Sequence, residues 1–536
     1  MQISASQAYC ILDTGGGAIL TKSGDVTVSY LLDTVEAYSL DVDGIEQRHN
    51  DFFRAFQHIR NGFIHKQDIF LRRKFDPEYM IKGDSYIQQA EKRHFTGREY
   101  LHHFCVLSFT LSGLLSLEKA YQVNPLSYKE ELTKSDRDKL GEFLESVENA
   151  ISIIRNIKNT SIRPLTTADI KQHIYRYVNG FHNDEGLRDI QFSDKLKIGQ
   201  KTGLFFAVSD ERYLPDKLKT HVSDTTLQDA NSSLYMAMLE RLGVHLMCSH
   251  VINQIWQFKG NSFKEDLAER VRQFGRYREF DKGIKKKYED LADYEQEIIN
   301  EENTLCKTHF NIALLEDEEA VLNKCIEQVK NIFTNAGFKY YIPSYEGLYN
   351  IFIGSVIGRE NCLDPSYLFL TDLHSSLCLN INYTSYKNDP EGILFNERIY
   401  QTPIRKDLWD AHKRRIPARN LIIVASTGGG KSVTSLNIIQ QYIEQSYKII
   451  VVEFGKSFYQ LSQLYKDKSL HVDYDGSAPL GINPFFTDGK KPDNEKVKTL
   501  VGLILKFWRE KTIMEDTKQV VSLTKIVNEY YEDVKE

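Results

Sequence analysis

One short segment constrains the fold of this 536-residue chain more than any other. Residues 421–424 (LIIV) are a run of apolar, mostly β-branched residues, 425–432 read Ala-Ser-Thr-Gly-Gly-Gly-Lys-Ser, and Val433–Ser446 has helical spacing. Such an apolar run is typical of a buried parallel strand. A strand, a glycine-rich loop and a helix in this order predict a P-loop, and with it an α/β domain whose first strand is Leu421–Val424.

The loop also predicts a ligand. Glycines let a backbone wrap around a phosphate with its N–H groups pointing inward, and the helix N-terminus adds electrostatic attraction. We therefore predict that the phosphates of ATP are bound by Ser426, Thr427, Gly428, Gly429, Gly430, Lys431, Ser432 and Val433. Lys431 would reach the β- and γ-phosphates, and the Ser432 hydroxyl would ligand Mg²⁺. The alternative is a glycine-rich β–α turn that binds nothing.

Two features separate this loop from a complete hydrolytic site. Ala425 stands where the usual pattern has its first glycine, which is a mild change because the phosphate-facing amides come mainly from later positions. Further apolar runs, Lys448–Glu453 and Leu470–Tyr474, predict a second and a third strand. Glu453 is expected near the nucleotide edge without acting as the hydrolytic base. No later strand ends in an Asp-Glu pair, so no catalytic residue is assigned.

The pattern of the whole chain predicts a multidomain protein of mixed α/β and α+β class. The expected regions are an N-terminal α+β module (1–125), a mostly helical region with a charged arm (126–300), a strand-helix-strand unit with a connector (301–400), and an incomplete P-loop (RecA-like) ATPase domain ending in a helical insertion (401–536). Within the first region, residues 18–32 alternate around a Ser23-Gly24-Asp25 turn, which predicts a β-hairpin. Within the second region, Ser135–Ile157 and Gln228–Phe258 are expected to be helices, and the charged arm at 283–305 is expected to be a solvent-exposed helix or a coiled coil.

Composition limits the setting. The net charge of -6 argues against attraction of nucleic acid to the whole surface, although it leaves room for a local basic groove. Seven cysteines without a C-x-x-C pair favour reduced thiols over a zinc ribbon or a disulfide framework. The N-terminus lacks the pattern of a secretory signal, and the weakly polar stretch Phe104–Leu117 is too short to cross a bilayer. We expect a cytoplasmic protein that associates with membranes only through partners.

Three further polar groups are expected to be structural. His65–Asp68 lies on one predicted strand, whose alternating faces would separate the four side chains, and this favours a packing or partner-contact role. His245–His250 has no common zinc spacing and falls in an apolar stretch with helical spacing, so core packing is expected. Arg414, Arg415 and Arg419 are expected in a solvated linker, with contact to DNA or to a neighbouring subunit's phosphate as the alternative.

The sequence resembles a known family at several of these places. The loop at 425–432, the segment VVEFGKSFYQLSQL at 451–464 and Gly481–Phe485 (GINPF) resemble the conjugation and type IV secretion ATPases, relatives of the HerA/FtsK class. Residues Ile64–Asp68 and 371–400 are similar to TraG-type ATPases of Bacteroidetes conjugative elements.

This resemblance implies an ATP-binding motor of conjugative DNA transfer that energises pilus and channel assembly. It implies a homo-hexamer, placed peripherally on the inner membrane by channel proteins, with DNA contact possible but indirect. It also implies that the last helices begin an insertion, so that the chain would be the N-terminal portion of a longer ATPase with little or no hydrolysis of its own. Two alternatives remain open, namely a HerA/FtsK-like DNA translocase and a non-hydrolysing assembly scaffold.

Overall fold

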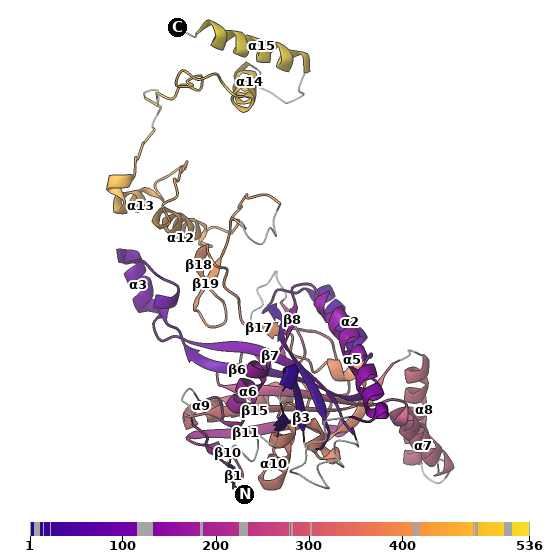
Figure 1. Ribbon diagram of the computed structural model, residues 1–536. Coiled ribbons are helices and arrows are strands. Elements are labelled where there is room, and N and C mark those ends of the chain that lie inside the picture. Colours follow the sequence, from indigo (N-terminus) through magenta and orange to yellow (C-terminus); the bar gives the residue numbers. More distant parts are fainter. Residues whose placement is uncertain are drawn as a thin grey trace. The chain divides into compact units, whose positions relative to one another are not determined.

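The chain divides into two compact units, residues 1–419 and 420–536, which are described separately. The computed structural model describes residues 2–4, 11–13, 15–21, 23–114, 132–182, 186–224, 234–277, 279, 282–300, 303–410, 417–474, 476–477, 481–508 and 517–534. The mixed α/β character predicted from the sequence is confirmed for the chain as a whole: the first unit combines helices with a large sheet, whereas the described part of the second unit contains helices and no strand (Figure 1). In the described part of the chain, no helix has both the length and the apolar character that crossing a bilayer requires.

The first unit is built on one large antiparallel sheet, to which thirteen of the described strands belong. Its strands follow one another in the order β1 (Gln2–Ser4), β9 (Asp189–Phe192), β10 (Leu196–Ile198), β11 (Lys201–Val208), β15 (Leu305–Glu316), β14 (His250–Lys259), β6 (Asn61–Lys74), β7 (Glu99–Leu111), β4 (Val26–Asp33), β3 (Ala18–Thr21) and β2 (Ile11–Asp13), while β16 (Phe369–Asp372) pairs with β15 and β8 (Ser161–Pro164) with β4. The three regions expected within residues 1–400 therefore all contribute strands to one sheet.

Three small strand pairs lie outside this sheet. They are β5 (Val35–Glu36) with β17 (Tyr383–Thr384), β12 (Val222–Ser223) with β13 (Tyr235–Met236), and β18 (Ile393–Asn396) with β19 (Pro403–Lys406). The first pair is parallel and the other two are antiparallel.

Helices cover both faces of the large sheet, which explains why its central strands are buried on both sides. One face packs on α6 (Thr167–Val178) and α10 (Tyr345–Gly354). The other packs partly on α9 (Glu319–Asn335) and partly on α2 (Val42–Phe56) with α5 (Lys134–Arg155). Figure 1 shows α2 and α5 side by side.

The remaining helices of the first unit are shorter or lie at its margin: α3 (Tyr86–Phe95), α7 (Ser262–Tyr277), α8 (Lys282–Asn300) and α11 (Leu373–Leu377). Helices α7 and α8 lie side by side and pack at their base against Leu305 (Figure 1). Among the described side chains of α8, only Ile298 is fully buried, which confirms the charged, solvent-exposed helix predicted there.

Local predictions succeeded where one face of an element is exposed and failed where both are buried. The hairpin around Ser23–Asp25 forms between β3 and β4, and α5 matches the helix predicted at 135–157. The helix predicted at Gln228–Phe258 is wrong, because the segment contains β13 and its last nine residues belong to strand β14. Both faces of β14 are buried, so its apolar residues do not alternate with polar ones, and a short apolar run of this kind is ambiguous between strand and helix.

The His65–Asp68 run lies in the middle of β6 and is fully buried, with its side chains directed to alternate faces. On one face, His65 Nε2 lies 3.1 Å from Asn253 Oδ1, and Gln67 Nε2 donates to the same oxygen at 2.7 Å. On the other face, Lys66 donates to Asp68 and, at 2.7 Å, to the carbonyl oxygen of Ile381. The prediction that the strand separates these side chains is confirmed, and every one of them has a partner inside the unit.

Candidate nucleotide-binding site

The glycine-rich loop of the second unit leads directly into a helix, α12 (Lys431–Glu444). Gly428 has φ 80° and Gly430, the N-cap residue, has φ 84°. A Cβ atom at either position would meet no atom within 4 Å, so space does not explain these glycines. Side-chain-bearing residues avoid this left-handed region, and glycine is therefore required by the path of the backbone.

The loop places the predicted residues on a continuous, exposed surface. Ser426–Gly429 lie in the loop, where the Gly429 N–H donates to the Ser426 carbonyl at 3.1 Å, and Lys431–Val433 form the first turn of α12. This turn contains no acidic residue. The backbone N–H groups of a first helical turn have no partner within the helix, so an anion is favoured here.

Lys431 lies folded back over its own loop. Its ammonium donates to the carbonyl oxygens of Ala425 at 2.7 Å and Ser426 at 2.9 Å. These two bonds use two of its three donors. Within the described residues, no hydrogen bond or ion pair joins Lys431 or Ser432 to a carboxylate. Both side chains are exposed, so a phosphate can reach them without displacing a protein anion.

The strands predicted beside the loop are not formed. Leu421–Val424 is neither a strand nor buried, since Ile422 is 85% and Val424 81% exposed. Lys448–Glu453, expected as the second strand, leaves Ile450 92% and Val452 90% exposed, and Leu470–Tyr474 is likewise outside any strand. A buried parallel strand obtains its burial from neighbouring strands and from helices on both faces. The described part of the second unit contains no sheet, so these apolar runs lack the surroundings that their composition predicts.

Glu453 has a local role in the turn that follows it. Its carboxylate accepts the backbone N–H groups of Ser457 at 3.0 Å and Phe458 at 3.1 Å, just before α13 (Tyr459–Leu464). These N–H groups lie at the start of a helix, where an acidic side chain is stabilising. The carboxylate at this position is thus explained without a hydrolytic role.

The Gly481–Phe485 element joins the loop region to a pair of helices, α14 (Asn494–Trp508) and α15 (Thr517–Asp533). Asn483 Oδ1 accepts the Phe485 N–H at 2.9 Å, which makes a local turn. The Phe485 ring lies 5.6 Å from that of Tyr530, and the Tyr531 hydroxyl donates to the Phe485 carbonyl at 2.6 Å. The element therefore anchors one aromatic side chain on the helix pair.

We expect Phe485→Ala to loosen this helix pair. Truncating a fully buried phenylalanine costs about 3–5 kcal/mol, so about half of that is expected for this half-buried ring. Amide hydrogen exchange in α14 and α15 should accelerate. The neighbouring Phe486 is 66% exposed, and Phe486→Ala serves as the matched control with little expected effect. Equal acceleration in both variants would contradict the anchoring role.

A comparison with known protein families identifies the kind of domain that contains the glycine-rich loop. Residues 392–536 match the family model of the TraG P-loop domain. This segment is a TraG-type P-loop domain. The resemblance seen in the sequence is thereby confirmed for the TraG-type domain, and a P-loop domain binds nucleotide phosphates in general. Comparison with curated proteins gives no match.

The polar groups expected to be structural are placed as follows. Arg414 and Arg415 lie outside the described residues. The Arg419 guanidinium lies 5.2 Å from the centre of the Trp409 ring, within the first unit. In the His245–His250 run, Cys248 and His250 are buried, whereas His245 reaches the wall of a pocket. The described residues contain no cluster of three or more metal-ligating side chains.

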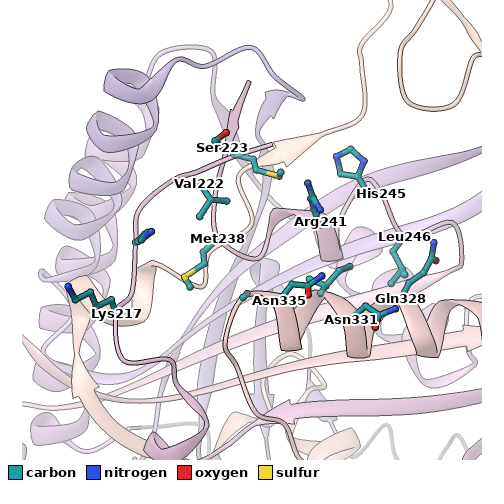
Figure 2. A pocket seen from close by; sticks show the side chains of 14 residues that line it. Lys217, Val222, Ser223, Met238, Arg241, His245, Leu246, Gln328, Asn331 and Asn335 are labelled. Atoms are coloured by element: carbon teal, nitrogen blue, oxygen red, sulfur yellow. The ribbon is translucent and has the colours of Figure 1, made fainter. Parts of the chain in front are cut away.

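That pocket is a second candidate site, which no sequence motif had indicated. Its volume is about 630 Å³, and it lies in the first unit between the β12–β13 pair and α9 (Figure 2). Helical spacing had been assigned to the segment that carries β13 and His245, and this assignment concealed the pocket. The available signal was the row Gln328, Asn331 and Asn335 on α9, because these amides fall on one helical face.

Proposed function

We propose that this chain is an ATP-binding motor component of a conjugative DNA-transfer (type IV secretion) system, where it energises assembly of the pilus or channel. The observation that carries this proposal is the glycine-rich loop that leads into α12, within the segment that matches the TraG P-loop domain. The family supplies the link to conjugative transfer, and the loop supplies the link to nucleotide.

ATP with Mg²⁺ fits the residues present. Gly428 and Gly430 give the loop the left-handed backbone conformation that lets N–H groups point toward a phosphate. Lys431 has one ammonium donor beyond the two that bind its own loop, and Ser432 offers a hydroxyl in the first helical turn. Bound ATP would supply the free energy of cleaving its phosphoanhydride bond. The chain's own contribution in this unit is to bind and orient the phosphates.

The partners belong to the same proposal. We place the protein peripherally on the inner membrane, held there by channel proteins, as a homo-hexamer when the motor is complete. The net charge of -6 supports a contact with DNA that is indirect, because a surface with this charge does not attract the phosphate backbone as a whole.

A mating experiment tests this function. In the host that carries the gene, deleting it should abolish transfer of the element, and the wild-type gene in trans should restore it. Unchanged transfer in the deletion strain would refute the proposal. Complementation with Lys431→Ala then distinguishes a motor, which should fail, from a scaffold, which should succeed. Lys448→Ala, an exposed lysine of the same unit, is the matched control.

A further inference from the structure

The pocket of the first unit has walls from three parts of the chain. The β12–β13 pair forms one wall, α9 forms the second, and residues 241–246 form the third. In the view of Figure 2, Lys217 lies at one end and His245 at the other. A volume of about 630 Å³ falls within the range of sites that enclose a ligand or part of a larger one.

The charge of the pocket is positive. Lys217, Lys219 and Arg241 line it, and none of its described lining residues is acidic. Arg241 is paired with the buried Asp224, so the unpaired positive charge is that of the two lysines. Both lysines are exposed, and within the described residues neither forms an ion pair. An occupant with negative charge at its flanks is therefore favoured, both in the encounter and in the bound state.

A chain of hydrogen bonds holds the polar wall in place. Arg241 donates to Asp224 at 2.5 Å, the Tyr38 hydroxyl donates to the same carboxylate at 2.7 Å, and His245 Nε2 lies 2.8 Å from the Tyr38 oxygen. Tyr38 has a single proton, which goes to Asp224, so His245 Nε2 must carry the proton of the last bond. The Nδ1 atom of His245 is then an acceptor. The side chains of this wall are held in place before an occupant binds, which lowers the entropy cost of binding.

The opposite wall offers amides in a row. Gln328, Asn331 and Asn335 lie at the spacing of one helical face, with Ile332 between them. The Gln328 Oε1 atom is buried, yet it has no hydrogen-bond partner among the described residues. An unpaired buried acceptor costs free energy, so a donor from an occupant is favoured here. Side-chain amides both donate and accept, which is what the N–H and C=O groups of a peptide backbone require.

The apolar lining favours a peptide over a nucleotide. Met236, Met238 and Leu246 are flexible or aliphatic, and methionine adapts to apolar side chains of different shape. The described lining residues include no Phe, Tyr or Trp. Nucleobases are commonly held by stacking on aromatic rings, and the only such ring among the described lining residues is the His245 imidazole, which is held by its bond to Tyr38.

We propose that this pocket binds an extended acidic peptide segment of a partner protein. One apolar side chain of the segment packs on Met236, Met238 and Leu246, its backbone bonds to the amides of α9, and its carboxylates lie near Lys217 and Lys219. The inference assigns to the first unit a docking function that is separate from the nucleotide site of the second.

Peptide display on the full chain tests the proposal even though the partner protein is unidentified. Random dodecapeptides selected on the wild-type protein should be enriched in sequences that combine acidic residues with an apolar one. The best of them, synthesised with blocked ends, should bind at least tenfold more weakly to Lys217→Glu/Lys219→Glu by calorimetry. Lys158→Glu/Lys197→Glu changes two exposed lysines outside the pocket lining, and so gives the same change in net charge as the control.

Three results would overturn the proposal. Failure to enrich acidic peptides, or equal weakening in the control variant, would overturn the proposal. So would tighter binding of a dT12 oligonucleotide that the Lys217→Glu/Lys219→Glu change abolishes, because the site would then be one for nucleic acid. Circular dichroism establishes that each variant is folded. Lys431→Ala should leave peptide binding unchanged, which keeps this test independent of the proposed motor function.

Discussion

Lys431→Ala is expected to reduce the affinity of this chain for ATP by about 10- to 200-fold, because a charge-assisted hydrogen bond contributes about 1.5–3 kcal/mol. In the structure, the ammonium lies over the loop and contacts only carbonyl oxygens, so its removal disturbs no ion pair of the described fold. The loss should therefore be one of phosphate contact rather than of folding. Titration with a fluorescent ATP analogue, with and without Mg²⁺, measures it.

Two controls sharpen this result. Lys448→Ala removes an exposed lysine of the same unit and should leave the affinity unchanged. Ser432→Ala should weaken binding in Mg²⁺ and have little effect in its absence, because the hydroxyl is predicted to act through the metal. Equal affinity of Lys431→Ala and wild type would show that the loop is a β–α turn without a ligand.

Asp68→Ala is expected to cost about 3–5 kcal/mol of folding free energy, since it leaves the buried Lys66 ammonium without its counter-charge. Burial alone would raise the pKa of Asp68, but Lys66 and His103 together lower it below its usual value. The carboxylate is therefore charged at neutral pH, and the pair is an ion pair. Urea unfolding of the full chain, followed by circular dichroism, measures the effect.

The matched variants separate the charge from the packing. Lys66→Met/Asp68→Asn removes both charges, and its asparagine can still bond to His103, so it should lose less than the single variant. Glu327→Ala breaks an exposed pair with Lys330 on α9 and should change stability little. If Asp68→Ala were as mild as Glu327→Ala, the buried pair would not support the sheet.

The sequence predicted those features of the fold that arise within a short stretch of the chain. The loop was identified because Gly428 and Gly430 are required by their own backbone angles. The hairpin at Ser23–Asp25 and the exposed helix α8 were identified for the same reason, as each follows from its own short pattern. Strand β14 was missed because burial on both faces depends on helices distant in the sequence.

The two candidate sites differ in the same way, since one arises from a short motif and the other from the tertiary fold. Lys431 and Ser432 were assigned from a contiguous motif, and the structure places them together at the start of one helix. The pocket brings together Lys217, Arg241 and Asn331 from separate segments, and only the tertiary fold shows that they are neighbours. The apolar runs beside the loop were predicted from composition as strands, yet a strand also needs neighbours, and the described part of the second unit supplies none.

The polar residues His65–Asp68 on β6 have a consequence for the register in which the strands of this large sheet pair. In a strand that is apolar on both faces, a slip by one residue still places apolar side chains on each face, so the hydrophobic pattern alone specifies the pairing only weakly. In β6, Gln67 stands directly opposite Asn253. A slip by one residue would set Lys66 opposite Asn253 and turn its ammonium toward the face that packs on α6 and α10, away from Asp68 and near His173, which now bonds to Gln67. An unpaired charge there would cost several kcal/mol. The four side chains thus make one alignment of the central strands far more stable than its neighbours.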